Sequence, residues 1–124
     1  MARILVIEDE SDIRALCLRI LTHAGHDVIE APDGKVGIEL YRDNPVDIVI
    51  TDIIMPEKEG VELIMELRRD FPDVKIIAMS GGGQATASAT CLRLAKGFGA
   101  VRTLAKPFNQ QELVDTVQEV LDGK

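Results

Sequence analysis

The sequence predicts an α/β protein in which helices cover both faces of a parallel five-stranded sheet. Short apolar runs alternate five times with longer segments whose apolar residues recur at helical spacing. Apolar strands joined in this way by amphipathic helices are typical of a parallel sheet buried on both faces. The chain has 124 residues, 46% of them apolar, which suits one domain with a core of its own.

The first unit begins with a predicted strand at residues 4–7, whose apolar run ILVI ends at an acidic stretch. Ser11 or Asp12 can cap the next helix, because either side chain accepts a hydrogen bond from an N–H group at a helix start. Apolar residues at helical spacing continue this helix to Ala24, and Gly25 ends it.

The second unit has a short strand at 27–31, and Asp33-Gly34 then turns the chain into a helix. Asn44-Pro45 ends that helix, since a residue before proline disfavours helical dihedral angles. The third strand is predicted at 46–51, directly before Asp52.

The third helix is predicted at 60–70, where Phe71-Pro72 closes it. A fourth strand follows at 74–79. We then expect a glycine-rich loop at 80–83 and a fourth helix at 85–96.

The last unit has a strand at 100–105 and a helix that Asn109 caps. The apolar face of this helix consists of Leu113, Val114, Val117, Val120 and Leu121. With right-handed crossovers, the five units form a doubly wound sheet of order 2-1-3-4-5, a flavodoxin-like (βα)5 three-layer sandwich. Ligands of such sheets bind beyond the carboxyl ends of the strands, at the switch point.

The net charge of −7 argues against binding to nucleic acid or to an anionic membrane surface. Arg68-Arg69 is the nearest approach to a basic cluster, and Asp70 follows it at once. The start of the chain has too short an apolar run for a signal peptide, and no stretch approaches the roughly 20 apolar residues of a membrane span.

Cys17 and Cys91 both lie in predicted helices, which suggests a reducing compartment rather than a disulfide framework. We therefore expect a cytoplasmic protein, with residues 1–124 forming a single domain and no output domain. His23 and His26 have no metal-ligand partner at a useful spacing and are expected at the surface.

Polar residues follow four of the predicted strands: Glu8 and Asp9 after the first, Asp52 after the third, Ser80 after the fourth and Lys106 after the fifth. Three carboxylates in one crevice repel one another and favour a bound cation. Oxygen ligands without His or Cys favour Mg²⁺, with Mn²⁺ possible, over zinc. A carboxylate beside a divalent cation, a lysine and hydroxyl and amide donors, including the Gly81 amide, has the parts needed for phosphoryl transfer to an aspartate.

In these motifs the chain resembles bacterial response-regulator receiver domains along its whole length. The motifs are Glu8-Asp9, Asp52 with Met55-Pro56 and Gly60, Ser80, and Lys106-Pro107-Phe108. Together, and in this order, they make a specific match to this family. Because no output domain is expected within the chain, it resembles the single-domain chemotaxis or phosphorelay type.

The resemblance implies that Asp52 accepts a phosphoryl group from a phosphohistidine of a sensor kinase or phosphotransfer protein. Glu8, Asp9, Asp52 and the Ile54 carbonyl would hold Mg²⁺, while Lys106 and Ser80 would bind the phosphoryl oxygens. The Lys106-Pro107 bond would be cis. The resemblance implies no enzyme activity beyond self-phosphorylation and slow dephosphorylation.

A downstream protein would bind the face formed by the fourth helix, fifth strand and fifth helix, and the chain would be a monomer or weak homodimer. Thr103 and Pro107 belong to this switch surface, as do Gly81 and Gly82. Thr103 stands where the family often has a switching aromatic residue.

Three other functions are alternatives. A pseudo-receiver would bind a partner without phosphorylation; the acid set and Lys106 argue against it, and the missing aromatic residue at Thr103 keeps it as an alternative. An aspartyl-phosphate phosphatase usually needs a second aspartate near the nucleophile, which Asp52-Ile53-Ile54 does not supply. A flavin-binding protein of this fold would need aromatic stacking surface, but the chain has one Tyr and no Trp.

Overall fold

The computed structural model describes residues 2–52, 60–80, 97 and 99–123. The described strands form one parallel sheet in the order β2-β1-β3-β4-β5, as predicted. The strands are β1 (Arg3–Ile7), β2 (Asp27–Ala31), β3 (Ile48–Asp52), β4 (Ile76–Ser80) and β5 (Arg102–Ala105).

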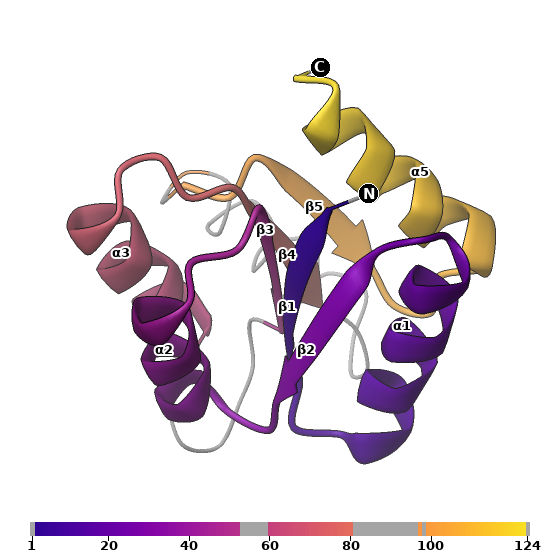
Figure 1. The fold of residues 1–124 in the computed structure, drawn as a ribbon, viewed down its shortest axis with the longest axis horizontal. Coiled ribbons are helices and arrows are strands. Elements are labelled where there is room, and N and C mark those ends of the chain that lie inside the picture. Colours follow the sequence, from indigo (N-terminus) through magenta and orange to yellow (C-terminus); the bar gives the residue numbers. More distant parts are fainter. Residues whose placement is uncertain (1, 53–59, 81–96, 98, 124) are drawn as a thin grey trace.

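Helices cover both faces of this sheet, with α1 and α5 on one face and α2 and α3 on the other (Figure 1). The described helices are α1 (Ser11–His23), α2 (Gly34–Asp43), α3 (Gly60–Asp70) and α5 (Gln110–Leu121). The predicted helix at 85–96 lies outside the described residues, as does the predicted loop at 80–83 apart from the backbone of Ser80.

The core has two parts, one on each side of the sheet. In β1, Leu5 and Ile7 pack with residues of α2 and α3, whereas Ile4 and Val6 pack with residues of α1 and α5. This alternation follows from the strand period of two, and it explains why β1 is apolar on both faces. Cys17 is free and buried on the α1 side, consistent with a packing role.

The helix ends agree with the sequence at most positions. Gly25 has φ +97°, and the N–H groups of Gly25 and His26 bond back to the carbonyls of Thr22 and Leu21 to close α1. Asn109 and Glu112 form a reciprocal capping box at the start of α5. The predicted side-chain cap of α1 is wrong.

Neither Ser11 nor Asp12 caps α1, because the helix already begins at Ser11 and its N-cap residue is Glu10. The Glu10 side chain makes no capping hydrogen bond.

His26 also differs from expectation: it is half-buried, and its Nδ1 accepts a hydrogen bond of 3.1 Å from the Ala2 N–H.

Three strands begin two residues later than predicted. Val46, Val74 and Ala100 are buried like strand residues but precede the paired strands. The Val74 N–H, for example, bonds to the Phe71 carbonyl in a turn rather than to a neighbouring strand. The predicted strands are too long at their starts because the residues just before the paired strands are also apolar.

Helix α2 approaches β1 closely at Gly37. A Cβ atom built on Gly37 would lie 2.4 Å from Ile7 Cδ1, so a larger residue would meet a fully buried side chain. Glycine is required here for close approach.

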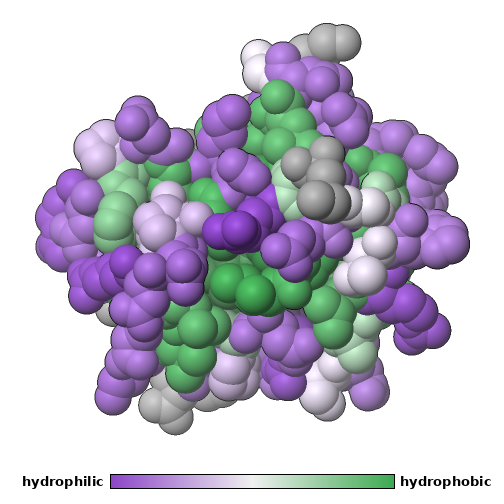
Figure 2. Space-filling view, in the orientation of Figure 1, coloured by the Kyte–Doolittle hydropathy of each residue, from purple (hydrophilic) through white to green (hydrophobic). Residues whose placement is uncertain are grey.

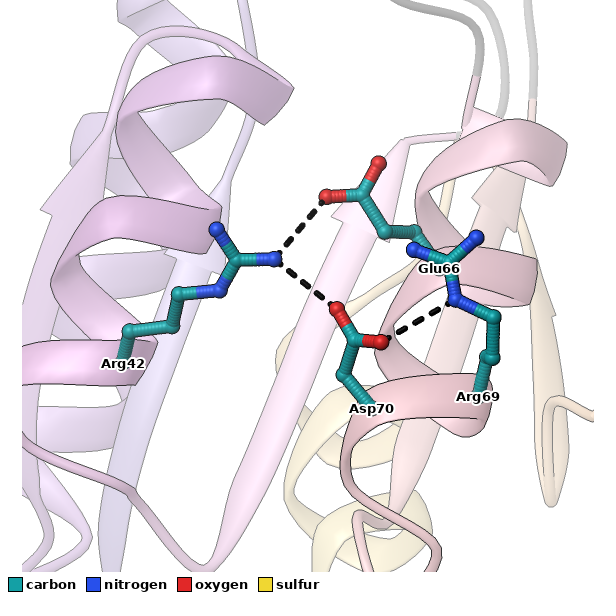
Figure 3. Close-up of polar contacts among 4 residues, drawn as sticks. All are labelled: Arg42, Glu66, Arg69 and Asp70. Atoms are coloured by element: carbon teal, nitrogen blue, oxygen red, sulfur yellow. Dashed lines mark hydrogen bonds and ion pairs between the residues drawn. The ribbon is translucent and has the colours of Figure 1, made fainter.

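Helices α2 and α3 are also joined by an ion-pair cluster (Figure 3). Arg42 Nη2 lies 2.8 Å from Asp70 Oδ2 and 3.5 Å from Glu66 Oε2, while Arg69 Nε lies 3.0 Å from Asp70 Oδ1. Both arginine side chains are exposed to at least half their area, so salt screens the cluster and it adds little stability.

The outer surfaces of the helices are mainly polar, and apolar residues show chiefly between the two helix layers (Figure 2). This distribution fits amphipathic helices that turn their apolar faces to the sheet. Among the described residues, no helix combines the length and apolar character needed to cross a bilayer.

Candidate functional site

The fold brings the acidic motifs together at the carboxyl edge of the sheet. Glu8 and Asp9 directly follow β1, and Asp52 is the last residue of β3. The two strands are neighbours, with Ile7 paired to Thr51, so the residues that follow lie side by side. This is the point where the strand order reverses, as expected for a binding site in a doubly wound sheet.

Lys106 connects the two acidic strand ends. Its Nζ lies 2.8 Å from Asp52 Oδ2 and also pairs with Glu8 Oε1. The side chains of Lys106, Glu8 and Asp52 are only 9%, 0% and 8% exposed, so water screens these charges weakly. The Lys106-Pro107 peptide bond is cis, as the resemblance implied.

Glu8 is the most strongly perturbed carboxyl group of the site. Burial and the nearby Asp52 carboxyl raise its pKa to about 8, although Lys106 acts in the opposite direction. Its Oε2 atom is buried and has no hydrogen-bond partner among the described residues. A buried carboxylate oxygen of this kind is costly unless another positive group satisfies it.

Asp9 completes a set of three carboxyl groups and is itself exposed. One ligand atom from each of Glu8, Asp9 and Asp52 lies within 4.8 Å of the others. The oxygen-only donors and the unpartnered Glu8 Oε2 fit a hard divalent cation such as Mg²⁺. The residues present therefore suit the cation that the sequence suggested.

Several predicted site residues are described only in part or not at all. Ile54, Gly81 and Gly82 lie outside the described residues. The Ser80 backbone pairs with Ala105, the residue before Lys106, so it lies at the same sheet edge; its side chain lies outside the described part. Thr103 is half-buried in β5, and Pro107 is exposed.

Sequence reasoning missed Arg14 and Glu30, which support the loop after β1. Arg14 Nη1 donates to the Glu8 carbonyl over 2.7 Å, and Arg14 Nε donates to Glu30 Oε1 over 3.0 Å. Arg14 lies within the first turns of the helix that follows the acidic pair, which is the one sequence signal that could have pointed to it.

Comparisons with known proteins agree with this geometry. The chain is 34% identical to the chemotaxis protein CheY of Thermotoga maritima, covering 95% of this chain and 96% of CheY. It is 32% identical to the response regulator receiver protein CpdR of Brucella abortus, covering 98% of both chains. A crystal structure of a receiver domain protein from Clostridium thermocellum superposes with a TM-score of 0.89 at 30% identity, covering 98% of this chain and 95% of that one.

The chain also resembles parts of longer proteins. It is 38% identical to the sensor kinase CckA of Brucella abortus over 98% of this chain, but spans only 13% of CckA.

The family model described as the response regulator receiver domain matches residues 4–118. The chain belongs to the response regulator receiver domain family.

Proposed function

We propose that Asp52 accepts a phosphoryl group from a phosphohistidine of a sensor kinase or phosphotransfer protein. An Asp52 carboxylate oxygen attacks phosphorus, the P–N bond to the histidine breaks, and an aspartyl phosphate forms while the imidazole leaves. The observation that carries the proposal is the contact of Lys106 with the buried carboxyl groups of Asp52 and Glu8, beside the exposed Asp9.

Glu8, Asp9 and Asp52 would hold Mg²⁺, or Mn²⁺ in its place, and the Ile54 carbonyl is proposed as a further ligand. The cation would supply positive charge that offsets the repulsion between the carboxylates and the incoming phosphoryl oxygens. The buried Glu8 Oε2 without a described partner supports this assignment.

Beside the acceptor Asp52, Lys106 has the most direct role among the described side chains. In the structure its ammonium group is shared between Asp52 and Glu8. Once Asp52 carries a phosphoryl group, the same ammonium can donate to a phosphoryl oxygen from nearly the same place. We propose the Ser80 hydroxyl as a second donor to that group.

Signalling would follow from protein–protein contacts that depend on phosphorylation. We propose the face that includes β5 and α5, with Thr103, Pro107, Gly81 and Gly82, as the surface that changes. The chain would act as a monomer or weak homodimer in the cytoplasm, without direct binding to nucleic acid or membranes. It would catalyse only its own phosphorylation and slow dephosphorylation. The similarity to part of a sensor kinase and to CheY supports this class of partners.

A pseudo-receiver that binds partners without phosphorylation is the second candidate. Thr103 favours it, because a threonine cannot provide the aromatic side chain that often reports phosphorylation in the family. Against it stand the complete acid set and the Lys106 contacts.

The test is incubation of the chain with Mg²⁺ and acetyl phosphate, followed by intact mass measurement. One added phosphoryl group is expected, base-labile, absent from Asp52→Asn and absent when EDTA removes the cation. Undiminished labelling of Asp52→Asn would refute the assignment. If wild type gains no mass and also fails to bind beryllium fluoride, the pseudo-receiver reading replaces the phosphoacceptor reading.

A further inference from the structure

We infer that Arg14 is a positioning residue that holds the Glu8-Asp9 backbone in the geometry needed for cation binding. Arg14 itself touches no carboxylate of the cation site among the described contacts; it acts through the main-chain carbonyl of Glu8 and the side chain of Glu30. The inference rests on the proposed function of the acidic site, because it assigns Arg14 a role in the affinity of that site.

The contacts of Arg14 use two different nitrogens of one rigid group. Nη1 donates to the Glu8 carbonyl over 2.7 Å, and Nε donates to Glu30 Oε1 over 3.0 Å. The Arg14 side chain is only 17% exposed, whereas the Glu30 side chain is 43% exposed. A planar guanidinium held at two points fixes its orientation better than a single contact would.

These contacts complete the fixation of the Glu8 peptide groups. The Glu8 N–H already donates to the Ala31 carbonyl at the end of β2, over 3.1 Å. Glu30, which anchors Arg14, is the neighbouring residue of β2 and is paired with Val6 of β1. The N–H and the C=O of Glu8 are therefore both tied to β2, one directly and one through Arg14.

The helix start gives Arg14 further importance. The N-cap residue Glu10 makes no side-chain capping bond, so no local cap fixes the short segment between β1 and α1. The Arg14 N–H bonds to the Glu10 carbonyl over 3.0 Å. That bond joins main-chain atoms only, so the arginine side chain contributes the tie between this segment and the sheet, through the Glu8 carbonyl and Glu30.

A role of Arg14 through its charge and a role through positioning predict opposite changes in cation affinity when Arg14 is removed. A positive guanidinium near a cation site repels the cation, so if charge were its main effect, its removal would tighten binding. If Arg14 positions the carboxylates, its removal loosens Glu8 and Asp9 and weakens binding. Groups that orient metal ligands typically account for about 10–100-fold in metal affinity.

The experiment measures Mn²⁺ affinity by electron paramagnetic resonance, with Mg²⁺ as competitor, on the full chain well below its melting temperature. Wild type is compared with Arg14→Gln, Arg14→Lys and Glu30→Gln. Arg19→Gln is the control, since Arg19 is an exposed arginine of the same helix. Thermal unfolding of each variant is recorded in parallel.

We expect Arg14→Gln to weaken cation binding about tenfold. Arg14→Lys keeps the charge but not the planar guanidinium, and Glu30→Gln keeps the arginine but weakens its anchor. Each of these two variants should bind the cation about threefold more weakly. Arg19→Gln should match wild type.

Unchanged or tighter cation binding by Arg14→Gln would overturn the inference, even if its melting temperature fell, because a purely structural role predicts that pattern. Should Arg14→Gln fail to fold, Arg14→Lys and Glu30→Gln decide the question by the same criterion. Failure of wild type to bind either cation would instead refute the proposed function, and this inference with it.

Discussion

Gly37→Ala tests how tightly the fold is packed behind the acidic site. The added Cβ would lie 2.4 Å from Ile7 Cδ1 and 2.7 Å from Ile7 Cγ1, and Ile7 is fully buried. Alanine in place of glycine in a helix adds about 1 kcal/mol of stability, whereas overpacking of a core costs about 1–3 kcal/mol. Because two atoms of Ile7 are too close, we expect the upper end of that cost and a net loss of about 2 kcal/mol in the free energy of unfolding.

The assay is urea unfolding followed by circular dichroism, arranged as a double-mutant cycle with Ile7→Val. That second change removes Cδ1, the atom nearest to the new methyl group. Alone it should cost about 0.5–1.5 kcal/mol, and in the Gly37→Ala background it should cost less or restore stability. Glu39→Ala, at an exposed position of the same helix, is the control.

A Gly37→Ala protein as stable as wild type, or additive effects of the two changes, would refute this account of the contact between α2 and β1. The result also matters for the site, because Ile7 directly precedes Glu8. A strained Ile7 should therefore weaken cation binding as well as stability.

Three further predictions concern other parts of the fold. Burial lowers the pKa of His26 below 6.5, so the unfolded chain gains its proton first and wild type should lose stability as the pH falls below about 6.5. His26→Asn keeps an acceptor for the Ala2 N–H and should not show the loss of stability that His26 protonation causes. If the urea unfolding midpoint shifts equally in both proteins between about pH 7.5 and 5.5, the prediction is wrong. Asn109→Ala removes the capping box of α5 and should cost about 1 kcal/mol by thermal unfolding, while an unchanged melting temperature would argue against the cap. Leu63 is fully buried, so Leu63→Ala should lower the free energy of unfolding by about 2–5 kcal/mol in urea. Met65, in the same helix, is 47% exposed, so Met65→Ala should change it by less than about 0.5 kcal/mol. Similar losses in the two variants would contradict this difference in burial.

The fold was predictable because its signals are local and repeat. Apolar runs and helical spacing alternate along the chain, and right-handed crossovers then restrict the strand order. Strand starts were less predictable, because Val46, Val74 and Ala100 are apolar and buried without belonging to the paired strands. Burial alone does not distinguish a strand residue from a buried residue in the preceding turn.

The acidic site was predictable for a related reason. Glu8, Asp52 and Lys106 each lie at the carboxyl end of a strand, and the topology of a parallel sheet brings these ends together. Arg14 and Gly37 could not be found in this way. Their roles depend on contacts with Glu30 and Ile7, residues in other elements, and no periodic pattern in the sequence marks such a contact.

The central claim is that Asp52 is the residue that receives the phosphoryl group, and locating that group tests it most directly. After incubation with acetyl phosphate and Mg²⁺, borohydride reduction converts an aspartyl phosphate to homoserine, which tandem mass spectrometry locates in a peptide. The account predicts homoserine at position 52 in wild type, and none in a sample from which EDTA has removed the cation. Homoserine at Asp9 or another carboxyl position, with Asp52 unmodified, would contradict it.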